Sequence, residues 1–257
     1  MSNLNLRRDS FITILSTRRS GKSYLVANLI HYFLTNSENR CDFLYMFSNT
    51  AKFEQGGNYN FIDNKVKFKA DPENAKKIVD AIFRTQLETR KKFHILVIFD
   101  DIDLSKRYED SIEKLATFGR HYHITTILSA QVATNAISPA IRNNTSYLFF
   151  RKLNAETIKK QIYSMIINGE FEHPQELYDY VQNNIQNYQF IFFDNDSDSK
   201  EIEIVKADPI PEGFIYKVKS PEKVDKTPKR PVGWGPPMNL TYFDSEGNAI
   251  RKSRPIL

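Results

Sequence analysis

The stretch Ser16-Thr17-Arg18-Arg19-Ser20-Gly21-Lys22-Ser23 decides the fold of this chain. An apolar run precedes it, Phe11-Ile12-Thr13-Ile14-Leu15, and an amphipathic run follows it, Tyr24-Leu25-Val26-Ala27-Asn28-Leu29-Ile30. This pattern predicts a buried strand, a tight loop and a helix, which is the setting that a phosphate-binding loop requires. Gly-Lys-Ser also occurs by chance in ordinary loops, but the flanking strand and helix favour the phosphate-binding interpretation.

The chemistry of this loop suits the phosphates of ATP. Backbone N–H groups of the loop and of the first helical turn point into one concavity, where the helix dipole adds positive potential. Lys22 is expected at the β- and γ-phosphates, the hydroxyl of Ser23 is expected on Mg²⁺, and residues Ser16 to Tyr24 together form the predicted nucleotide-binding segment. Ser16 replaces the first Gly of the G-x-x-x-x-G-K-[ST] pattern. A small residue still permits the turn if its φ stays negative.

The composition limits the classes of protein to consider. The 257 residues suffice for one large α/β domain and an appendage. Cys41 is the single cysteine, which excludes an internal disulfide and a multi-cysteine zinc site and fits a reducing compartment. No signal-peptide segment or membrane-spanning run is recognisable, so we expect a protein that is not secreted and has no membrane partner. The net charge of +5 is compatible with a polyanionic partner without establishing one.

A second aliphatic run, Ile95-Leu96-Val97-Ile98-Phe99, ends in two acids, Asp100 and Asp101. It predicts a buried strand with a carboxylate at its C-terminal end, which is the Walker B arrangement. Asp100 is expected to hold Mg²⁺, and Asp101 to orient or deprotonate the attacking water. The simpler alternative is that the two acids cap the next helix.

A third strand, predicted from Ile124 to Gln131, ends in a polar residue. In the additional-strand class of P-loop NTPases this strand lies between the phosphate-loop strand and the strand of Asp100. Ligands collect at the carboxyl ends of strands in an open α/β sheet, so Gln131 is predicted to face the γ-phosphate as a sensor, although a glutamine at a strand end means little alone. His121 and His123 lie near the start of the strand, far from that end, and we assign them no chemistry.

The remaining pattern predicts a three-layer α/β fold. Further strands are expected at 41–47 and 147–150, a short edge strand near 66–69, helices at 72–89, 108–122, 155–167 and 174–185, and a hairpin made of 188–193 and 201–205. With the core strands numbered in chain order, the additional-strand class implies the order 5-1-4-3-2. The Asp-rich turn of the hairpin lacks the Gly and the bidentate Glu of a calcium loop, so we interpret it as a solvated turn.

Residues 1–207 are therefore predicted to form the P-loop ATPase domain, and residues 208–257 an extended tail rich in proline and lysine. Eight of the eleven prolines lie between Pro209 and Pro255, mixed with basic residues. Such a composition is typical of a docking segment or of a disordered one.

Taken in order, five motifs resemble those of one family. They are the loop at 16–23, Asp100-Asp101, Gly119-Arg120-His121, Leu128-Ser129-Ala130-Gln131 and Ile141-Arg142-Asn143. Over about residues 8–206 the chain resembles the genome-packaging ATPases of large double-stranded DNA viruses and virophages, the poxvirus-like branch of the FtsK/HerA superfamily. The Arg-His dipeptide before the third strand and the Pro-x-x-Ile-Arg-Asn-Asn segment narrow the choice beyond a general NTPase.

This resemblance implies a homo-oligomeric ring, pentameric or hexameric, with ATP at the subunit interfaces. It implies double-stranded DNA in the pore, a capsid protein at the packaging vertex as a further partner, and a location in the virion or in the host-cell cytoplasm at the viral factory. It also implies an arginine finger supplied in trans. The candidates are Arg142, expected just past the third strand at the edge of the sheet that carries the phosphate loop, and Arg120, at the start of that strand. The alternative for each is a salt bridge or a contact to a DNA phosphate. Asp101 is one methylene shorter than the Glu common in the superfamily, which leaves its direct role as a base in doubt and is compatible with positioning of the water.

Other functions fit part of the pattern. A small-molecule P-loop kinase would need an arginine-rich lid and an acceptor pocket, and the pairing of Asp100 and Asp101 with Gln131 argues against it. A non-packaging DNA pump or helicase-type ATPase would carry the same motifs, and nucleotide binding that serves only assembly also stays open. The sequence favours an ATP-driven motor that packages double-stranded DNA.

Overall fold

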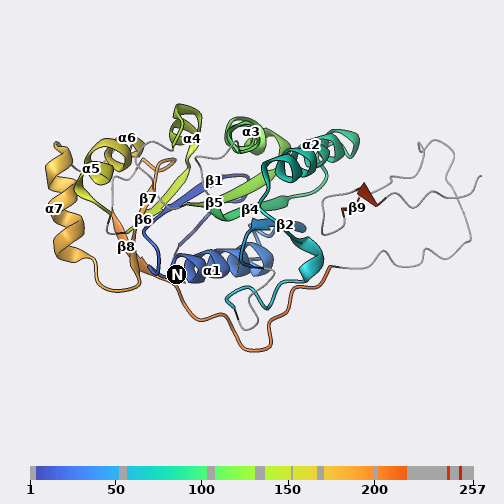
Figure 1. Ribbon diagram of the computed structural model, residues 1–257, viewed down its shortest axis with the longest axis horizontal. Coiled ribbons are helices and arrows are strands. Elements are labelled where there is room, and N and C mark those ends of the chain that lie inside the picture. The colour runs from blue at the N-terminus through green and yellow to red at the C-terminus, as the bar shows by residue number, and fades with distance from the viewer. Residues whose placement is uncertain are drawn as a thin grey trace, which may run out of the picture.

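The computed structural model describes residues 4–51, 57–102, 108–130, 137–151, 153–166, 171–198, 202–218, 242–243 and 249–250. Eight strands form one sheet in the order β3-β2-β4-β5-β1-β6-β7-β8 (Figure 1). They are β1 (Phe11–Leu15), β2 (Phe43–Ser48), β3 (Lys67–Phe68), β4 (Ile95–Ile102), β5 (Ile124–Ala130), β6 (Tyr147–Phe150), β7 (Gln189–Asp194) and β8 (Glu203–Lys206). A separate pair contains β9 (Tyr242–Phe243) and β10 (Ala249–Ile250).

The first six strands pair in parallel, whereas β7 and β8 are antiparallel. The core order is thus β6-β1-β5-β4-β2, which confirms the predicted order 5-1-4-3-2. All five residues of β1 are buried, as expected for a central parallel strand covered on both faces. The short edge strand β3 and the β7-β8 hairpin were also predicted correctly.

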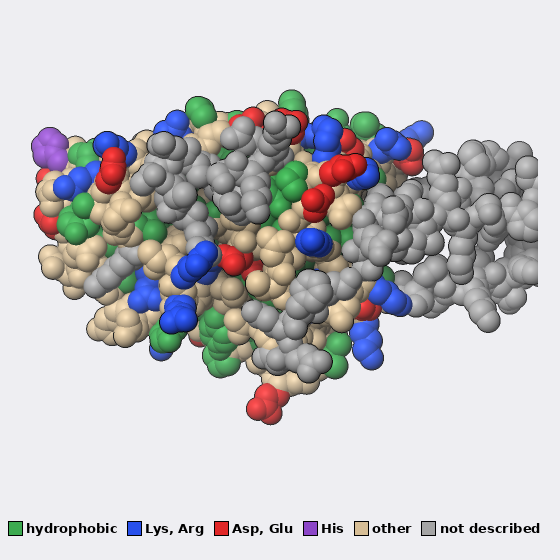
Figure 2. Space-filling model, in the orientation of Figure 1, with side chains coloured by type: hydrophobic (Ala, Val, Ile, Leu, Met, Phe, Trp, Pro, Cys, Tyr) green, Lys and Arg blue, Asp and Glu red, His purple; other side chains and the backbone are tan. Residues whose placement is uncertain are grey.

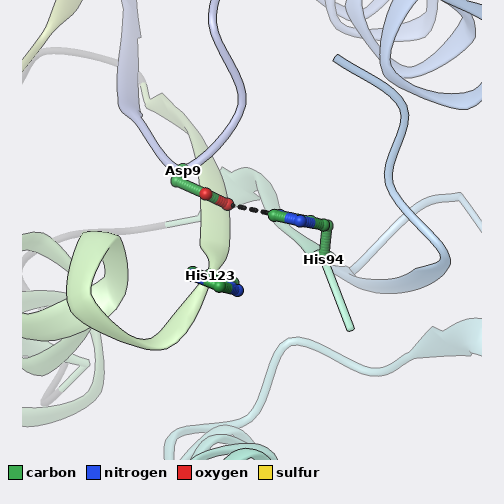
Figure 3. A group of neighbouring side chains, drawn as sticks. All are labelled: Asp9, His94 and His123. Carbon is green, nitrogen blue, oxygen red and sulfur yellow. Dashed lines mark hydrogen bonds and ion pairs between the residues drawn. The ribbon is translucent and has the colours of Figure 1, made fainter. Parts of the chain in front are cut away.

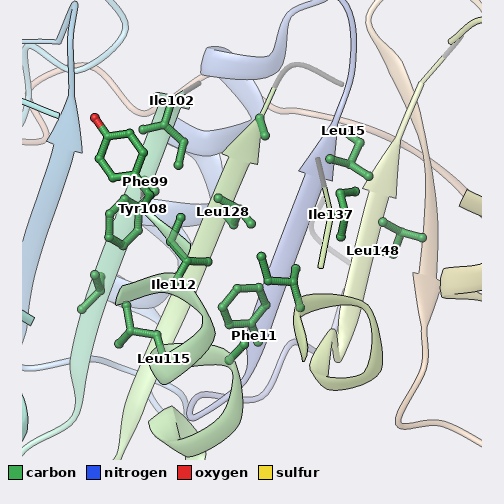
Figure 4. Packing of buried hydrophobic residues seen from close by; sticks show 14 of the residues in the cluster. Phe11, Leu15, Phe99, Ile102, Tyr108, Ile112, Leu115, Leu128, Ile137 and Leu148 are labelled. Atoms are coloured by element: carbon green, nitrogen blue, oxygen red, sulfur yellow. The ribbon is translucent and has the colours of Figure 1, made fainter. Parts of the chain in front are cut away.

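The helices form a layer on each side of the sheet, which confirms the three-layer α/β class (Figure 1). The helices are α1 (Lys22–Thr35), α2 (Pro72–Glu88), α3 (Glu109–Phe118), α4 (Pro139–Asn144), α5 (Ala155–Thr157), α6 (Tyr163–Met165) and α7 (Pro174–Asn184). Helix α1 covers one face, where it packs with Ile12 and Ile14 of β1. Phe11 and Leu15 point to the other face of the sheet, the one that carries α3 and α4, because side chains alternate along a strand (Figure 4).

Two predicted helices differ in detail. The helix expected over 108–122 ends at Phe118 and continues as a 3₁₀ turn from Gly119 to Tyr122, after which His123 adopts a left-handed φ of 53° and β5 begins. The helix expected over 155–167 has a π-helical segment, Ile158–Ile162, between α5 and α6. Among the described residues, no helix has both the length and the apolar character that crossing a membrane requires.

The first residues of the predicted tail pack onto the domain on the side of α1. The amide of Asn28 donates to the carbonyl of Asp208 at 2.9 Å, and the ring of Phe214 meets that of His31 edge-on at 4.6 Å. Tyr216 exchanges backbone hydrogen bonds with the segment around Phe61. The residues beyond 218 lie outside the described part of the chain, except for β9 and β10.

Gln86 joins α2 to the starts of two central strands. Its side chain is fully buried, and its Nε2 atom donates to the carbonyl oxygens of Phe93 at 2.7 Å and Tyr122 at 2.5 Å. These two carbonyls precede β4 and β5, so one buried amide group binds acceptors from two separate segments.

We expect Gln86→Leu to lower the free energy of unfolding by about 1–3 kcal/mol, because two part-buried carbonyls lose their donor. Chemical denaturation measures this change. Gln175→Leu is the matched control, since Gln175 is exposed and its side chain donates to Asp179 one turn away. It should change stability by less than about 0.5 kcal/mol. Equal effects of the two substitutions would contradict the role given to Gln86.

Candidate active site

The loop between β1 and α1 forms a cradle at the carboxyl edge of β1. Thr17, Arg18 and Arg19 are exposed, whereas Ser16, Ser20 and Lys22 are buried. The hydroxyl oxygens of Ser16 and Ser20 lie 2.6 Å apart and are hydrogen-bonded across the base of the loop. Ser16 is not among the residues with positive φ, so its backbone meets the condition under which serine can replace glycine there.

Gly21 ends the loop and begins α1. Its φ is 87°, in the left-handed region that favours glycine, and its carbonyl accepts hydrogen bonds from the N–H groups of Tyr24 and Leu25 at 3.1 Å. A Cβ atom at this position would lie 2.8 Å from Cδ1 of Tyr188. The backbone conformation therefore favours glycine here, and a Cβ atom would in addition have to displace the exposed ring of Tyr188.

Lys22 is a buried cation in the first turn of α1. Its side chain is 6% exposed, and its Nζ atom lies 3.6 Å from Oδ1 of Asp101. Within the described residues, Nζ has no hydrogen-bond partner. Burial lowers the pKa of Lys22, and the charges of Asp101 and Asp100 act against that shift. An ammonium group held in this way is suited to receive an anion such as phosphate.

Asp100 is fully buried on β4 and is held by two hydroxyl groups. Its Oδ2 atom accepts from the hydroxyl of Tyr59 at 2.6 Å, and Oδ1 accepts from the hydroxyl of Ser129 at 2.8 Å. Burial raises the pKa of Asp100, although both hydrogen bonds and the charge of Lys22 lower it. A divalent cation would stabilise the ionised carboxylate, as expected of a Walker B acid.

A β-bulge in β4 allows Asp101 to reach Lys22. Asp100 pairs with Ser129 but Ile102 pairs with Ala130, so Asp101 is the extra residue, and its φ of 51° is left-handed. Without the bulge, side-chain alternation would point Asp101 to the face of the sheet opposite Asp100. Ile102 takes that place in the hydrophobic cluster of Phe99 instead. Both carboxylates thus lie near the phosphate loop.

The remaining predicted residues of the nucleotide site are Ser23, Tyr24 and Gln131. Ser23 is half-buried in the first turn of α1, and Tyr24 is 37% exposed next to it. Gln131 lies outside the described residues, directly after Ala130, so its predicted sensor role stays a prediction.

Neither candidate arginine finger lies beside Lys22 of its own chain. Arg120 is in the 3₁₀ turn before β5 and lines a small cavity with Asp9 and Ser146, at the amino-terminal ends of the strands. Arg142 was expected at the edge of the sheet that carries the phosphate loop. It lies instead in α4 over the face of the sheet, because α4 runs back toward the start of β6, and its guanidinium donates to the hydroxyl of Ser164 at 3.3 Å.

The structure adds four residues near the site that the sequence did not indicate, namely Tyr59, Ser129, Arg151 and Tyr188. Tyr59 and Ser129 bind Asp100, as described above. Arg151 follows β6 directly and donates to the carbonyl of Ser20 at 2.7 Å, and its guanidinium lies 5.9 Å from the ring centre of Tyr188. The rule that selected Gln131, a polar residue at a strand end, would also have selected Arg151 and Ser129. Tyr59 lies in a polar segment that gave no signal.

We expect Gly21→Ala to weaken ATP binding by at least about 10-fold, because the Cβ atom strains the loop backbone and collides with Tyr188. Titration with a fluorescent ATP analogue measures the change. Gly213→Ala is the matched control, since Gly213 also has positive φ but nothing lies within 4 Å of its added Cβ. If both variants bound the analogue like the original chain, the cradle would not depend on Gly21.

We expect Asp100→Asn to raise the stability of the nucleotide-free protein at neutral pH. Because the pKa of Asp100 is raised, the folded protein binds the carboxyl proton more strongly than the unfolded chain does. Ionisation of Asp100 therefore lowers the stability of the fold at neutral pH, and this loss of stability becomes smaller as the pH falls. Urea denaturation at several pH values tests this, with Asp80→Asn as the comparison, because Asp80 is a half-exposed carboxylate that is paired with Lys114 of α3. A less stable Asp100→Asn protein would show that the charge stabilises the fold.

Comparison with known proteins identifies a family that the sequence matches and solved structures that share its fold. The sequence profile described as "Poxvirus A32 protein" matches residues 2–206. No curated protein is significantly similar to the chain in sequence.

Three solved structures share the fold at low sequence identity. The genome packaging NTPase B204 of Sulfolobus turreted icosahedral virus 2, bound to AMPPCP, is 16% identical with a TM-score of 0.55, covering 79% of this chain and 99% of its own. The DNA-packaging ATPase B204 of Sulfolobus turreted icosahedral virus is 17% identical with a TM-score of 0.52, covering 80% and 100%. The pCW3 conjugation coupling protein TcpA, bound to ATPγS, is 17% identical with a TM-score of 0.52, covering 79% and 61%.

These likenesses agree with the predicted P-loop NTPase fold, and the profile match confirms the family resemblance drawn from the sequence. The phosphate loop, the two acids at the end of β4 and the strand order all fall within the matched residues, and the chain belongs to the poxvirus A32 protein family.

Proposed function

We propose that this chain is an ATP-driven motor that moves double-stranded DNA into a viral capsid. The observation that carries the proposal is the buried ammonium of Lys22, which has no hydrogen-bond partner among the described residues and faces Asp101 at 3.6 Å beside the buried Asp100. The family supports the proposal, as does the fold, which is similar to that of packaging NTPases.

The charges of the site fit a triphosphate together with Mg²⁺. Burial disfavours the charged form of Lys22 and the charged form of Asp100, so each group gains from a ligand of opposite charge. Lys22 would hold the β- and γ-phosphates, and Asp100 and Ser23 would hold the cation. When bound, Mg²⁺ neutralises charge on the phosphate oxygens during transfer.

Asp101 is suited to position the attacking water. Its carboxylate is about one third exposed and is paired with Lys22, the residue that a triphosphate also attracts. Binding of the triphosphate therefore competes with Asp101 for the ammonium and frees a carboxylate oxygen to accept a hydrogen bond from water. Gln131, which follows β5, is the proposed sensor of the γ-phosphate.

Assembly into a homo-oligomeric ring would complete the site. Since Arg120 and Arg142 lie away from Lys22 of their own chain, either would act on ATP only as a finger supplied to a neighbouring subunit. We propose double-stranded DNA in the ring, a capsid protein as docking partner, and action in the virion or the host-cell cytoplasm. On the face shown in Figure 2, described Lys and Arg side chains lie among Asp and Glu side chains over much of the surface.

ATP turnover with and without duplex DNA tests the proposal. We expect DNA to stimulate hydrolysis, stimulation to fall as salt rises because phosphate contacts dominate, and turnover to increase steeply with protein concentration as rings form. Lys22→Ala should lower kcat at least about 100-fold. Lys77→Ala, which removes an exposed lysine paired with Glu73 on α2, should leave kcat unchanged.

The results separate the competing functions. Transfer of phosphate from ATP to a nucleoside would favour a small-molecule kinase. DNA-stimulated hydrolysis without binding to capsid protein would favour a non-packaging DNA pump. Nucleotide binding without hydrolysis would favour a role in assembly alone, and each of these outcomes would contradict the packaging motor.

A further inference from the structure

Asp9, His94 and His123 gather at the amino-terminal edge of the sheet (Figure 3). They precede β1, β4 and β5, the strands whose opposite ends carry the phosphate loop, Asp100 and Gln131. One ligand atom from each of the three side chains lies within 4.8 Å of the other two. His94 and Asp100 are separated by most of an extended strand, about 20 Å, so this cluster is distinct from the nucleotide site.

The side chains of the cluster face one another. Oδ1 of Asp9 lies 3.0 Å from Nδ1 of His94, and the imidazole rings of His94 and His123 stack with centres 4.7 Å apart and planes 9° from parallel. The side chains of His94 and Asp9 are only 18% and 21% exposed. Nδ1 of His123 is buried and has no hydrogen-bond partner within the described residues. A buried ring nitrogen in this condition has a lone pair or a proton left unsatisfied.

Backbone contacts fix the three residues independently of their side chains. Asp9 has a φ of 63°, and its N–H donates to the hydroxyl of Thr125 at 2.7 Å. The N–H of His94 donates to the carboxylate of Asp42 at 2.9 Å, and the carbonyl of His123, which has a φ of 53°, accepts from the N–H of Ile95 at 2.9 Å. The cluster is therefore preorganised by three separate segments of the chain.

We propose that Asp9, His94 and His123 bind a divalent transition-metal ion of the zinc type. Two imidazole nitrogens and one carboxylate oxygen form a donor set that suits zinc, whereas Mg²⁺ prefers oxygen ligands. Two ligand atoms that each lie about 2.0–2.2 Å from one ion are roughly 3.0–3.5 Å from each other. Oδ1 of Asp9 and Nδ1 of His94, which are 3.0 Å apart, already have this separation. Rotation of the His123 ring about its χ2 torsion would bring one of its two ring nitrogens to the same ion, and a water molecule would take the fourth ligand position.

The ion would act as a cross-link. It would join the segment before β1 to the starts of β4 and β5, which neighbour one another in the sheet order β4-β5-β1. The three strands would then be held at one edge while their other edge binds ATP. Binding would stabilise the folded chain in proportion to the logarithm of free zinc concentration.

Zinc binding by the full chain tests the proposal. Equilibrium dialysis with Zn²⁺, in excess Mg²⁺ to occupy oxygen-rich sites, should show one tight site per chain, and Co²⁺ should give the visible absorption of a tetrahedral nitrogen and oxygen site. Thermal denaturation should show a higher melting temperature with Zn²⁺. Asp9→Asn and His123→Asn should each weaken binding at least about 10-fold, and asparagine tolerates the left-handed backbone at both positions.

Two controls localise the ion. His121→Asn alters an exposed histidine two residues from His123 and should bind Zn²⁺ like the original chain. Lys22→Ala should also keep zinc binding while losing ATP hydrolysis, so failure of the metal site and failure of the motor proposal are distinguishable. Absence of a tight zinc site in the original chain, or equal zinc affinity in the folded Asp9→Asn and His123→Asn proteins, would overturn the proposal.

Discussion

The interaction of one buried cation with two carboxylates, one in an ion pair and one through its charge alone, is the constraint on which this site depends. Lys22 is held in the first turn of α1 with 6% of its side chain exposed, and the compensating charges come from a different strand, β4. A buried ammonium without a full set of hydrogen bonds is costly, and so is the buried carboxylate of Asp100. In the function that we propose, ATP and Mg²⁺ supply the opposite charges that offset these costs.

That pairing requires the observed order of strands. Because β5 lies between β1 and β4, the phosphate loop and the paired acids are not on adjacent strands, and Ser129 of β5 binds Asp100 from the strand between them. The left-handed bulge then turns Asp101 toward α1. A regular strand points consecutive side chains to opposite faces, so the local irregularity of β4 is what brings both acids to the same side of the sheet.

Much of this was predictable from the sequence, and the limits have a physical origin. Each central strand is rich in apolar residues and is followed by polar residues, so the pattern of residues is enough to place Lys22 and Asp100 at one edge of the sheet. The bulge at Asp101, the hydroxyl of Tyr59 and the group formed by Asp9, His94 and His123 depend on contacts between residues far apart in the chain. Periodicity carries no information about such contacts, and the rule that ligands collect at the carboxyl ends of strands directs attention away from His123.

The packing of residues 208–218 against α1 determines where the chain can be shortened. Phe214 contacts both His31 and Phe61, and Asp208 receives a hydrogen bond from Asn28 in the helix that begins with Lys22. A truncation at the compositional boundary near residue 207 would uncover aromatic surface on that helix and favour aggregation. An expression vector for crystallisation should therefore end after Val218 rather than at the first proline of the tail.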